Sequence, residues 1–79
     1  MERFIFPNHR RAKAALEVMK HLIDWYGVAS RADMIDIHGT LPKPEDQKFG
    51  WVDLSNASIG PGAIGNEAVL ELPRALRLE

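Results

Sequence analysis

The chain contains one glycine motif with the letters of a phosphate-binding loop. Gly60-Pro61-Gly62-Ala63-Ile64-Gly65 matches G-x-G-x-x-G. Phosphate binding by that motif requires a strand before it and the N-terminus of a helix after it, within a βαβ unit. The residues after Gly65 alternate as a strand does, and the chain is too short for a nucleotide-binding sheet. This segment is therefore predicted to be a hairpin loop.

The histidines do not have the spacing of a metal site. His9, His21 and His38 are spread over two predicted helices and a helix start, and the chain has no cysteine. A zinc site needs three or four converging ligands. We therefore predict no metal and no cofactor. His21 is expected in solvent, and His38 is expected to be half-buried at a helix end, near a favourable C-terminal dipole.

The carboxylates and serines also lack a catalytic arrangement. Acid–base catalysis needs carboxylates in one cleft with different pKa values. Asp33 and Asp36 share one short predicted helix and Glu45-Asp46 lie in a loop, where capping or solvation accounts for them. The serines lie near no histidine in the sequence and in no nucleophile-elbow context. The chain is therefore predicted not to be an enzyme.

Length and charge limit the remaining classes. The 79 residues allow one domain, 1–79, in which 1–7 is an N-terminal arm or strand and 73–79 a C-terminal tail. No stretch approaches the roughly 20 apolar residues of a membrane span. Residues 1–31 hold six Arg or Lys against three Asp or Glu, whereas residues 32–72 hold two against seven. The chain is thus basic at its amino end and acidic in its hairpin half.

The clearest predicted element is a long amphipathic helix. Asn8, after Pro7, can cap its N-terminus, and Gly27 follows the last helical residue as a C-terminal glycine does. One face has the i, i+3, i+4, i+7 spacing of a buried stripe. That face consists of Ala12, Ala15, Leu16, Met19, Leu22, Ile23 and Tyr26.

A second, narrower apolar strip runs along the same helix, beside the core face. It consists of Ala14, Val18 and Trp25. One interpretation is contact with the hairpin or with the amino-terminal Phe4-Ile5-Phe6 segment. The other is a face for homo-oligomer formation, which a chain with so small a core would favour.

The rest of the chain alternates short elements with turns. Ser30 can cap a helix to His38, with Asp33 in a variant capping box and Gly39 after it. Residues 44–56 are expected to form a helical turn or two, although an irregular segment is the alternative. Gly60-Pro61-Gly62 and Gly65-Asn66 predict turns, and residues 68–72 alternate as an edge strand that Pro73 terminates.

Two architectures fit this order of elements. The favoured one is an α+β, winged-helix-like domain with two to three helices followed by a β-hairpin. In the alternative, Phe4 to Phe6 forms a strand that joins the hairpin in a three-stranded sheet under the first helix. Both predict the same core: Leu16, Met19, Leu22, Ile23, Tyr26, Met34, Ile35, Trp51, Leu54, Ile59, Leu70 and Leu72.

Asp46-Gln47-Lys48-Phe49-Gly50-Trp51-Val52-Asp53-Leu54 resembles the signature of a family of small bacteriophage proteins, Asp-x-Lys-aromatic-Gly-Trp-x-Asp-Leu. Members also open a helix with Arg-Arg-Ala-Lys, as at residues 10–13, and end a hairpin in Leu-Pro-Arg, as at residues 72–74. The resemblance implies a phage or prophage origin. The absence of cysteine fits a cytoplasmic place in the host cell. Members usually carry basic residues in the hairpin loop, whereas residues 58–67 have no Lys or Arg.

These patterns favour a binding module over other classes. We expect protein–protein interaction with a host or phage partner, and the alternative is a small winged-helix regulator that binds DNA. A small ligand held by the glycine loop and Trp51 is a weaker option. The residues expected to contact a protein or nucleic acid are Arg10, Arg11, Lys13, Lys48 and Trp51. Trp51 fits a core position equally well, and only exposure would make it a contact residue.

Overall fold

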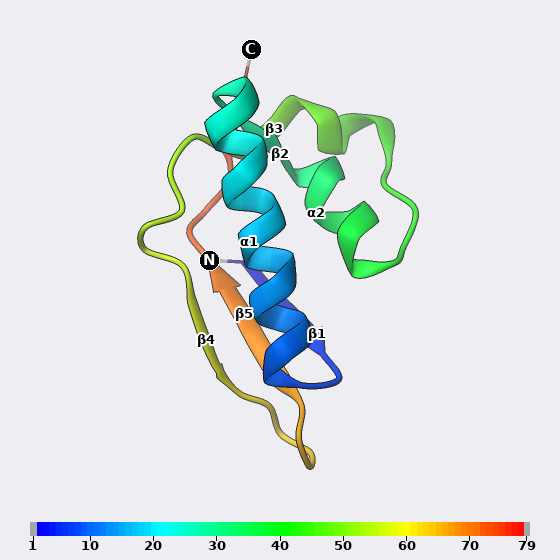
Figure 1. Cartoon of the computed structure of the whole chain (residues 1–79). Coiled ribbons are helices and arrows are strands. Elements are labelled where there is room, and N and C mark those ends of the chain that lie inside the picture. Colours follow the sequence, from blue (N-terminus) through cyan, green and yellow to red (C-terminus); the bar gives the residue numbers. More distant parts are fainter. Residues whose placement is uncertain (1, 79) are drawn as a thin grey trace.

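A computed structural model describes residues 2–78 of the chain. Over that range the fold is α+β, with two α-helices and two antiparallel three-stranded sheets (Figure 1). The elements, in chain order, are β1 (Glu2–Phe6), α1 (His9–Tyr26), β2 (Ala29–Ser30), α2 (Arg31–His38), the 3-10 helix η1 (Pro44–Lys48), β3 (Phe49–Trp51), β4 (Ser58–Pro61), β5 (Ala68–Leu72) and β6 (Leu76–Arg77).

Helix α1 begins and ends where the sequence predicts. The Asn8 side-chain oxygen accepts a hydrogen bond from the Arg11 amide at 2.9 Å, which satisfies one of the free N–H groups of the first turn. Gly27 follows Tyr26 with φ of +81°, a left-handed conformation that glycine adopts without a steric cost. Within α1, the buried residues are Ala12, Ala15, Leu16 and Met19, all of which belong to the predicted apolar face.

The cap gives a first testable prediction. Asn8→Ala should lower the free energy of unfolding by about 1 kcal/mol, because it removes the acceptor for the Arg11 amide. Asn8→Ser is the control, since serine restores an acceptor and should unfold within a few tenths of a kcal/mol of wild type. Urea denaturation followed by circular dichroism measures both. Equal midpoints for Asn8→Ala and wild type would show that the cap is unimportant.

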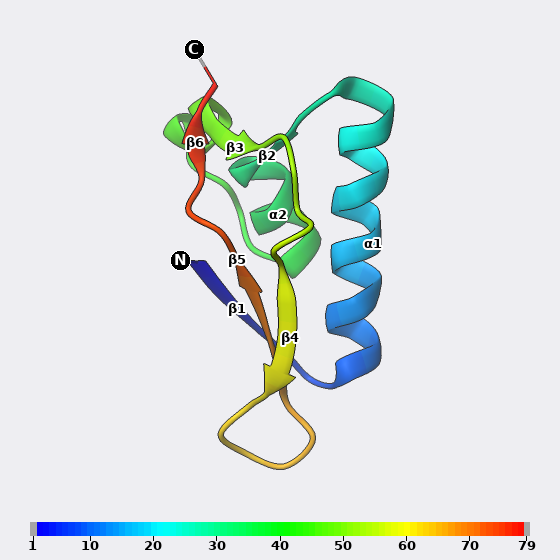
Figure 2. The ribbon, with the colours of Figure 1, turned by 90° about the vertical axis from the view of Figure 1, so that its left-hand side faces the viewer.

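The first sheet has the order β1-β5-β4 and lies against one face of α1 (Figures 1 and 2). Phe4 and Ile59 both pair with Leu70 in the central strand, and all three are buried or pack against the core. The sheet is thus the one expected in the second architecture, with Phe4 to Phe6 as a strand. The prediction that residues 68–72 form an edge strand is wrong. Strand β5 pairs with β4 on one edge and with β1 on the other, so it is the central strand of the sheet.

The second sheet, β2-β3-β6, lies near the opposite end of α1 from the loop that joins β4 to β5 (Figure 2). Its strands are two or three residues long, and α2 packs beside it. Helix α2 has the predicted capping box: the Asp33 amide donates to the Ser30 hydroxyl at 3.0 Å, and the Ser30 amide donates to the Asp33 carboxylate at 2.9 Å. Strand β6 lies in the segment predicted to be a tail.

Residues 44–56 contain the expected helical turn, which is the 3-10 helix η1, and then strand β3. Asp46 is buried and accepts a hydrogen bond from the Lys43 amide at 2.8 Å, which fixes the start of η1. The Arg31 Nε lies 3.0 Å from Glu2 Oε1 and 3.8 Å from Asp46 Oδ1. The charges of Glu2, Arg31 and Asp46 thus connect β1, α2 and η1. Of the acidic pair Glu45-Asp46, Asp46 therefore has a structural role.

The hairpin turn differs from the predicted one. Gly60 and Pro61 lie within β4, opposite Val69 and Ala68, so Gly60-Pro61-Gly62 is not itself the turn. The loop spans residues 62–67, closed by the Gly62 amide donating to the Glu67 carbonyl at 2.7 Å. No helix follows the loop, which agrees with a hairpin rather than a phosphate-binding motif.

Most of the predicted core is confirmed, with two exceptions. Tyr26 is 72% exposed because it occupies the last turn of α1, beyond the reach of the first sheet. Ile35 is only half-buried and is not among the residues packed on the core. Phe6 and several alanines are buried instead. The buried hydrophobic core consists of Phe6, Ala12, Ala15, Leu16, Met19, Ala29, Ala32, Met34, Trp51, Leu54, Ala68, Leu70 and Leu72.

The Gly-Trp-x-Asp-Leu block has a structural role at each named position. Gly50 lies against the backbone of β2, Leu54 is buried, and Trp51 is 2% exposed, with its indole N–H donating to the Pro73 carbonyl at 2.6 Å. Asp53 accepts hydrogen bonds from the Ser55 amide at 3.0 Å and the Ser55 hydroxyl at 2.9 Å. Both bonds stabilise the carboxylate and hold the pKa of Asp53 below its usual value.

Candidate interaction groove

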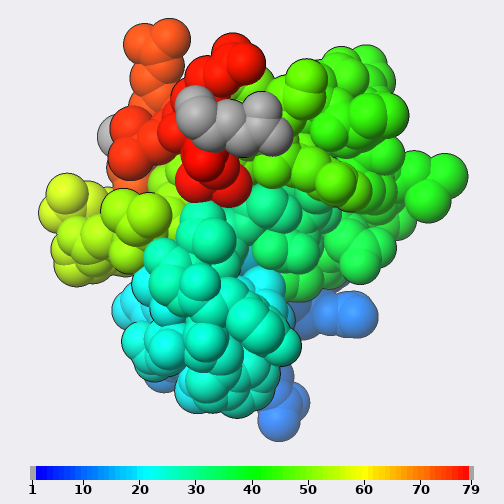
Figure 3. Space-filling view, turned by 90° about the horizontal axis from the view of Figure 1, so that it is seen from above, coloured from blue at the N-terminus to red at the C-terminus, as the bar shows by residue number. Residues whose placement is uncertain are grey.

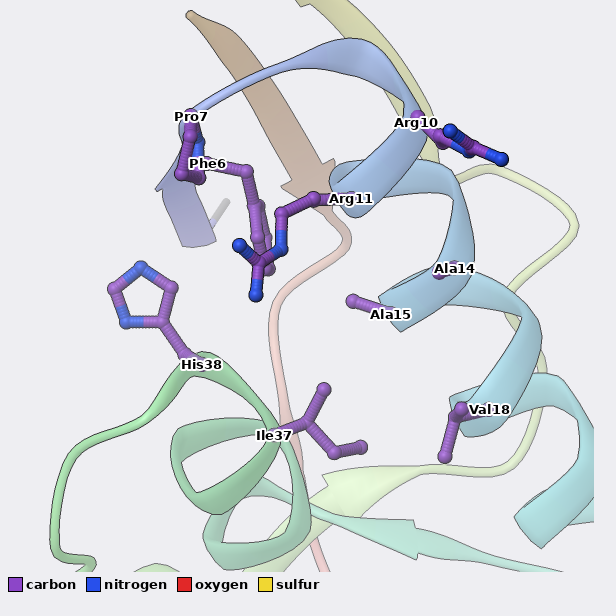
Figure 4. A pocket seen from close by; sticks show the side chains of 9 residues that line it. All are labelled: Phe6, Pro7, Arg10, Arg11, Ala14, Ala15, Val18, Ile37 and His38. Carbon is purple, nitrogen blue, oxygen red and sulfur yellow. The ribbon is translucent and has the colours of Figure 1, made fainter.

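A surface groove lies between the first turns of α1, the last turn of α2 and the end of β1 (Figure 4). Its volume is about 590 Å³. We call it the α1 groove. It is lined by Phe6, Pro7, Arg10, Arg11, Ala14, Ala15, Val18, Ile37 and His38.

Local sequence positions these side chains. Strand β1 ends at Phe6, and Pro7-Asn8 turns the chain into α1, so both sides of the turn contribute to the groove. Helix α1 contributes residues three or four positions apart, which lie on one helix face: Arg11, then Ala14 or Ala15, then Val18. Val18 and Ile37 extend into the groove from α1 and α2 (Figure 4). Because the side chains of Ala14 and Ala15 are small, the space between α1 and α2 stays open.

His38 fixes the wall formed by α2. Its Nε2 donates a hydrogen bond to the Ile5 carbonyl at 2.8 Å, because a carbonyl oxygen can only accept. Its ring also meets Phe4 and Phe6 edge-on, with centroids 5.6 and 5.1 Å apart. The half-buried position expected for His38 is confirmed. Its side chain ties the end of α2 to β1, which gives the groove a fixed shape.

The groove combines an apolar floor with basic residues. Five of its residues are alanine, valine, isoleucine or phenylalanine, and none of its nine residues is a carboxylate. The Arg11 side chain extends into the groove toward His38, whereas Arg10 points away from it at the rim (Figure 4). Neither arginine forms an ion pair with a carboxylate of residues 2–78. Such a surface can bind an apolar side chain and carboxylates together.

The apolar strip predicted on α1 is exposed. Ala14 and Val18 belong to the groove, and Val18 is 44% exposed. Trp25 is 70% exposed and stacks on His21, with ring centroids 5.6 Å apart and planes 19° apart. The last turns of α1 project beside the rest of the molecule when it is viewed along the helix (Figure 3). Trp25 therefore is not covered by the hairpin or by β1, and His21 is in solvent as expected.

The five predicted contact residues do not form one site. Arg10 and Arg11 line the groove, whereas Lys13 is exposed on α1 outside it. Lys48 directly precedes β3, at the end of the molecule opposite the start of α1 (Figure 1). Trp51 is a core residue and offers a partner almost no surface. Only the two arginines, joined by Ala14 and Val18 of the strip, remain on a common surface.

The sequence did not predict five of the nine groove residues as site residues: Phe6, Pro7, Ala15, Ile37 and His38. Pro7, Ile37 and His38 become neighbours of α1 only through the packing of α2 and β1, which no local pattern encodes. Ile37 carried a weak signal, since it is an apolar residue near the end of α2 that the predicted core did not include.

Metal sites, membrane spans and similarity to known proteins were the other possible indications of function. Within residues 2–78, no three His, Cys, Asp or Glu side chains converge as metal ligands would. None of the helices in that range combines the length and apolar content that crossing a bilayer requires. Compared with protein-family models, with curated proteins and with solved structures, the chain has no significant match in any of the three.

Proposed function

We propose that this chain is a non-enzymatic binding module of phage origin that acts by protein–protein contact with a host or phage partner in the host cytoplasm. The observation that supports this proposal is the α1 groove, an apolar hollow rimmed by Arg10 and Arg11. Beyond the groove on the same helix, Trp25 of the strip is also exposed. Tryptophan and arginine are the side chains most enriched among the residues that dominate protein-binding energy. The phage origin rests on the resemblance of residues 46–54.

The alternative is a small DNA-binding regulator of winged-helix type, which Arg10 and Arg11 alone favour. A DNA reader needs a helix that enters the major groove and cations that contact phosphates around it. The segment between α2 and β3 is a five-residue 3-10 helix that carries Glu45 and Asp46 against Lys48. The hairpin loop, residues 62–67, has no Lys or Arg. The charges therefore support protein binding over nucleic-acid binding.

A capture experiment with charge-matched variants tests this proposal. Arg11→Glu and Lys13→Glu change the charge of α1 by the same amount, but only Arg11 lines the groove. Tagged wild type, Arg11→Glu and Lys13→Glu are incubated with nuclease-treated host lysate, with and without phage infection. Wild type and Lys13→Glu should retain the same protein. Arg11→Glu should retain about tenfold less, because a repelled charge at a contact costs on the order of 1.4 kcal/mol.

Two results would contradict protein binding at the groove. One is retention of nucleic acid in place of protein from a parallel lysate that is not treated with nuclease, with the retention lost on nuclease treatment and with added salt. The other is equal retention of the captured protein by Arg11→Glu and Lys13→Glu. Folding of each variant is checked first by circular dichroism, since both residues are exposed and neither should destabilise the chain.

A further inference from the structure

The exposed face of α1 has the spacing that a second helix packs against. Arg11, Ala14, Val18, His21 and Trp25 are all exposed, and they follow one another at alternating intervals of three and four residues. This alternation is the a/d spacing of a helix–helix contact, in which side chains of one helix insert between those of the other. The first three residues of this face line the α1 groove. The face and the groove therefore form one elongated surface.

An extended segment fits the same surface less well. A strand that added to the outer edge of β1 would need the backbone groups of that edge as hydrogen-bond partners, the Ile5 carbonyl among them. The His38 ring already donates to that carbonyl at 2.8 Å, and α2 lies beside it. The edge nearest the groove is thus occupied, so the groove favours a helix as its occupant.

The charges of the groove define the chemistry of that helix. Arg10 and Arg11 bring two positive charges, and no lining residue brings a negative one. A partner helix with Asp or Glu beside its apolar face can pair with both arginines, and the guanidinium fork binds a carboxylate in a bidentate manner. A large apolar side chain of that helix can occupy the space over Ala14, Ala15 and Ile37.

A second copy of α1 does not meet this requirement in full. An antiparallel pair that places Trp25 of the second copy opposite Arg11 brings only one carboxylate, that of Asp24, near the two arginines of each groove. A parallel pair places Arg11 opposite Arg11, and like-charge contacts at an interface oppose association.

We propose that the α1 groove binds an acidic amphipathic helix of another protein, with one large apolar side chain seated between α1 and α2 and carboxylates on Arg10 and Arg11. This inference rests on the proposed function and specifies its partner class.

Selection from a library of random peptides displayed on yeast tests it, with the tagged full chain as the target. The enriched peptides should place large apolar residues three and four positions apart, flanked by Asp or Glu. A synthetic copy of the most enriched peptide should become helical on binding, as circular dichroism would show. Its affinity should fall about tenfold for Arg11→Glu and stay within about twofold for Lys13→Glu, the charge-matched control.

Each contrary result has its own meaning. Enriched peptides that lack acidic residues but lose binding to Val18→Glu would overturn the acidic partner and leave protein binding at the groove intact. An absence of peptides that depend on Arg11 or Val18 would overturn the inference, while the capture experiment decides the proposed function separately. A dimer of the free chain, seen by sedimentation and dissociated by Val18→Glu, would identify a second copy as the occupant of the groove. That result would also overturn the inference of an acidic partner helix.

Discussion

Trp51→Ala is expected to lower the free energy of unfolding by about 3–5 kcal/mol, the usual cost of truncating a buried tryptophan. Trp51 is 2% exposed and belongs to the core that connects both sheets to α1. The substitution also leaves the Pro73 carbonyl without its donor at 2.6 Å. Because small domains have only about 5–15 kcal/mol of stability in total, a large part of it would be lost. Urea denaturation measures the change.

Trp51→Phe separates the two contributions of this residue. Phenylalanine keeps most of the ring in the core but has no N–H for the Pro73 carbonyl. The expected loss is about 1–3 kcal/mol, the cost of leaving a buried acceptor unpaired. A stability of Trp51→Ala equal to that of wild type would show that residue 51 lies on the surface, and the assignment of Trp51 to the core would be wrong.

Gly50→Ala is expected to have the second-largest effect. It should lower the free energy of unfolding by about 1–3 kcal/mol, the usual cost of overpacking a closely packed position. A Cβ at position 50 would lie 2.3 Å from the Ala29 carbonyl oxygen and 2.8 Å from the Ser30 Cα. Both atoms belong to the backbone of β2, the strand that pairs with β3, so no side-chain rotation can relieve the contact. Strands β2 and β3 must move apart, and thermal unfolding would report the loss.

Gly60→Ala is the matched control, because it makes the same substitution in another strand. A Cβ at Gly60 would meet nothing within 4 Å, so the stability should stay within about 0.5 kcal/mol of wild type. Equal effects of the two substitutions would mean that strand propensity, and not the approach of β2, decides the result at Gly50.

The elements with strong local signals were predicted correctly, whereas the pairing of β1 with the hairpin was expected only in the alternative architecture. Asn8, Gly27 and the apolar face of α1 are local features that act within one helix, and they set its bounds. The central place of β5 depends on its pairing with β1, which is more than sixty residues away in sequence. The sequence of neither strand alone indicates that Phe4 pairs with Leu70. The strand at residues 76–77 depends in the same way on β3.

The candidate site was predicted in part for the same reason. Arg10, Arg11, Ala14 and Val18 lie on one helix, and their spacing places them on adjoining faces before any packing is known. The walls from α2 and β1 could not be predicted, because the angle between α1 and α2 depends on the core around Met34 and Trp51. Trp51 was proposed both as a core and as a contact residue, and its burial selects the core position.

Site-specific photo-crosslinking can show whether a partner protein lies on the α1 groove. A benzophenone amino acid is placed at Ala14 or Val18 in the groove, or at Lys13 or Lys20 elsewhere on α1. After irradiation in host cells, we predict a crosslinked partner protein from positions 14 and 18 and none from positions 13 and 20. Crosslinks only from positions 13 and 20, or only to nucleic acid, would contradict the account of the groove as a protein-binding surface.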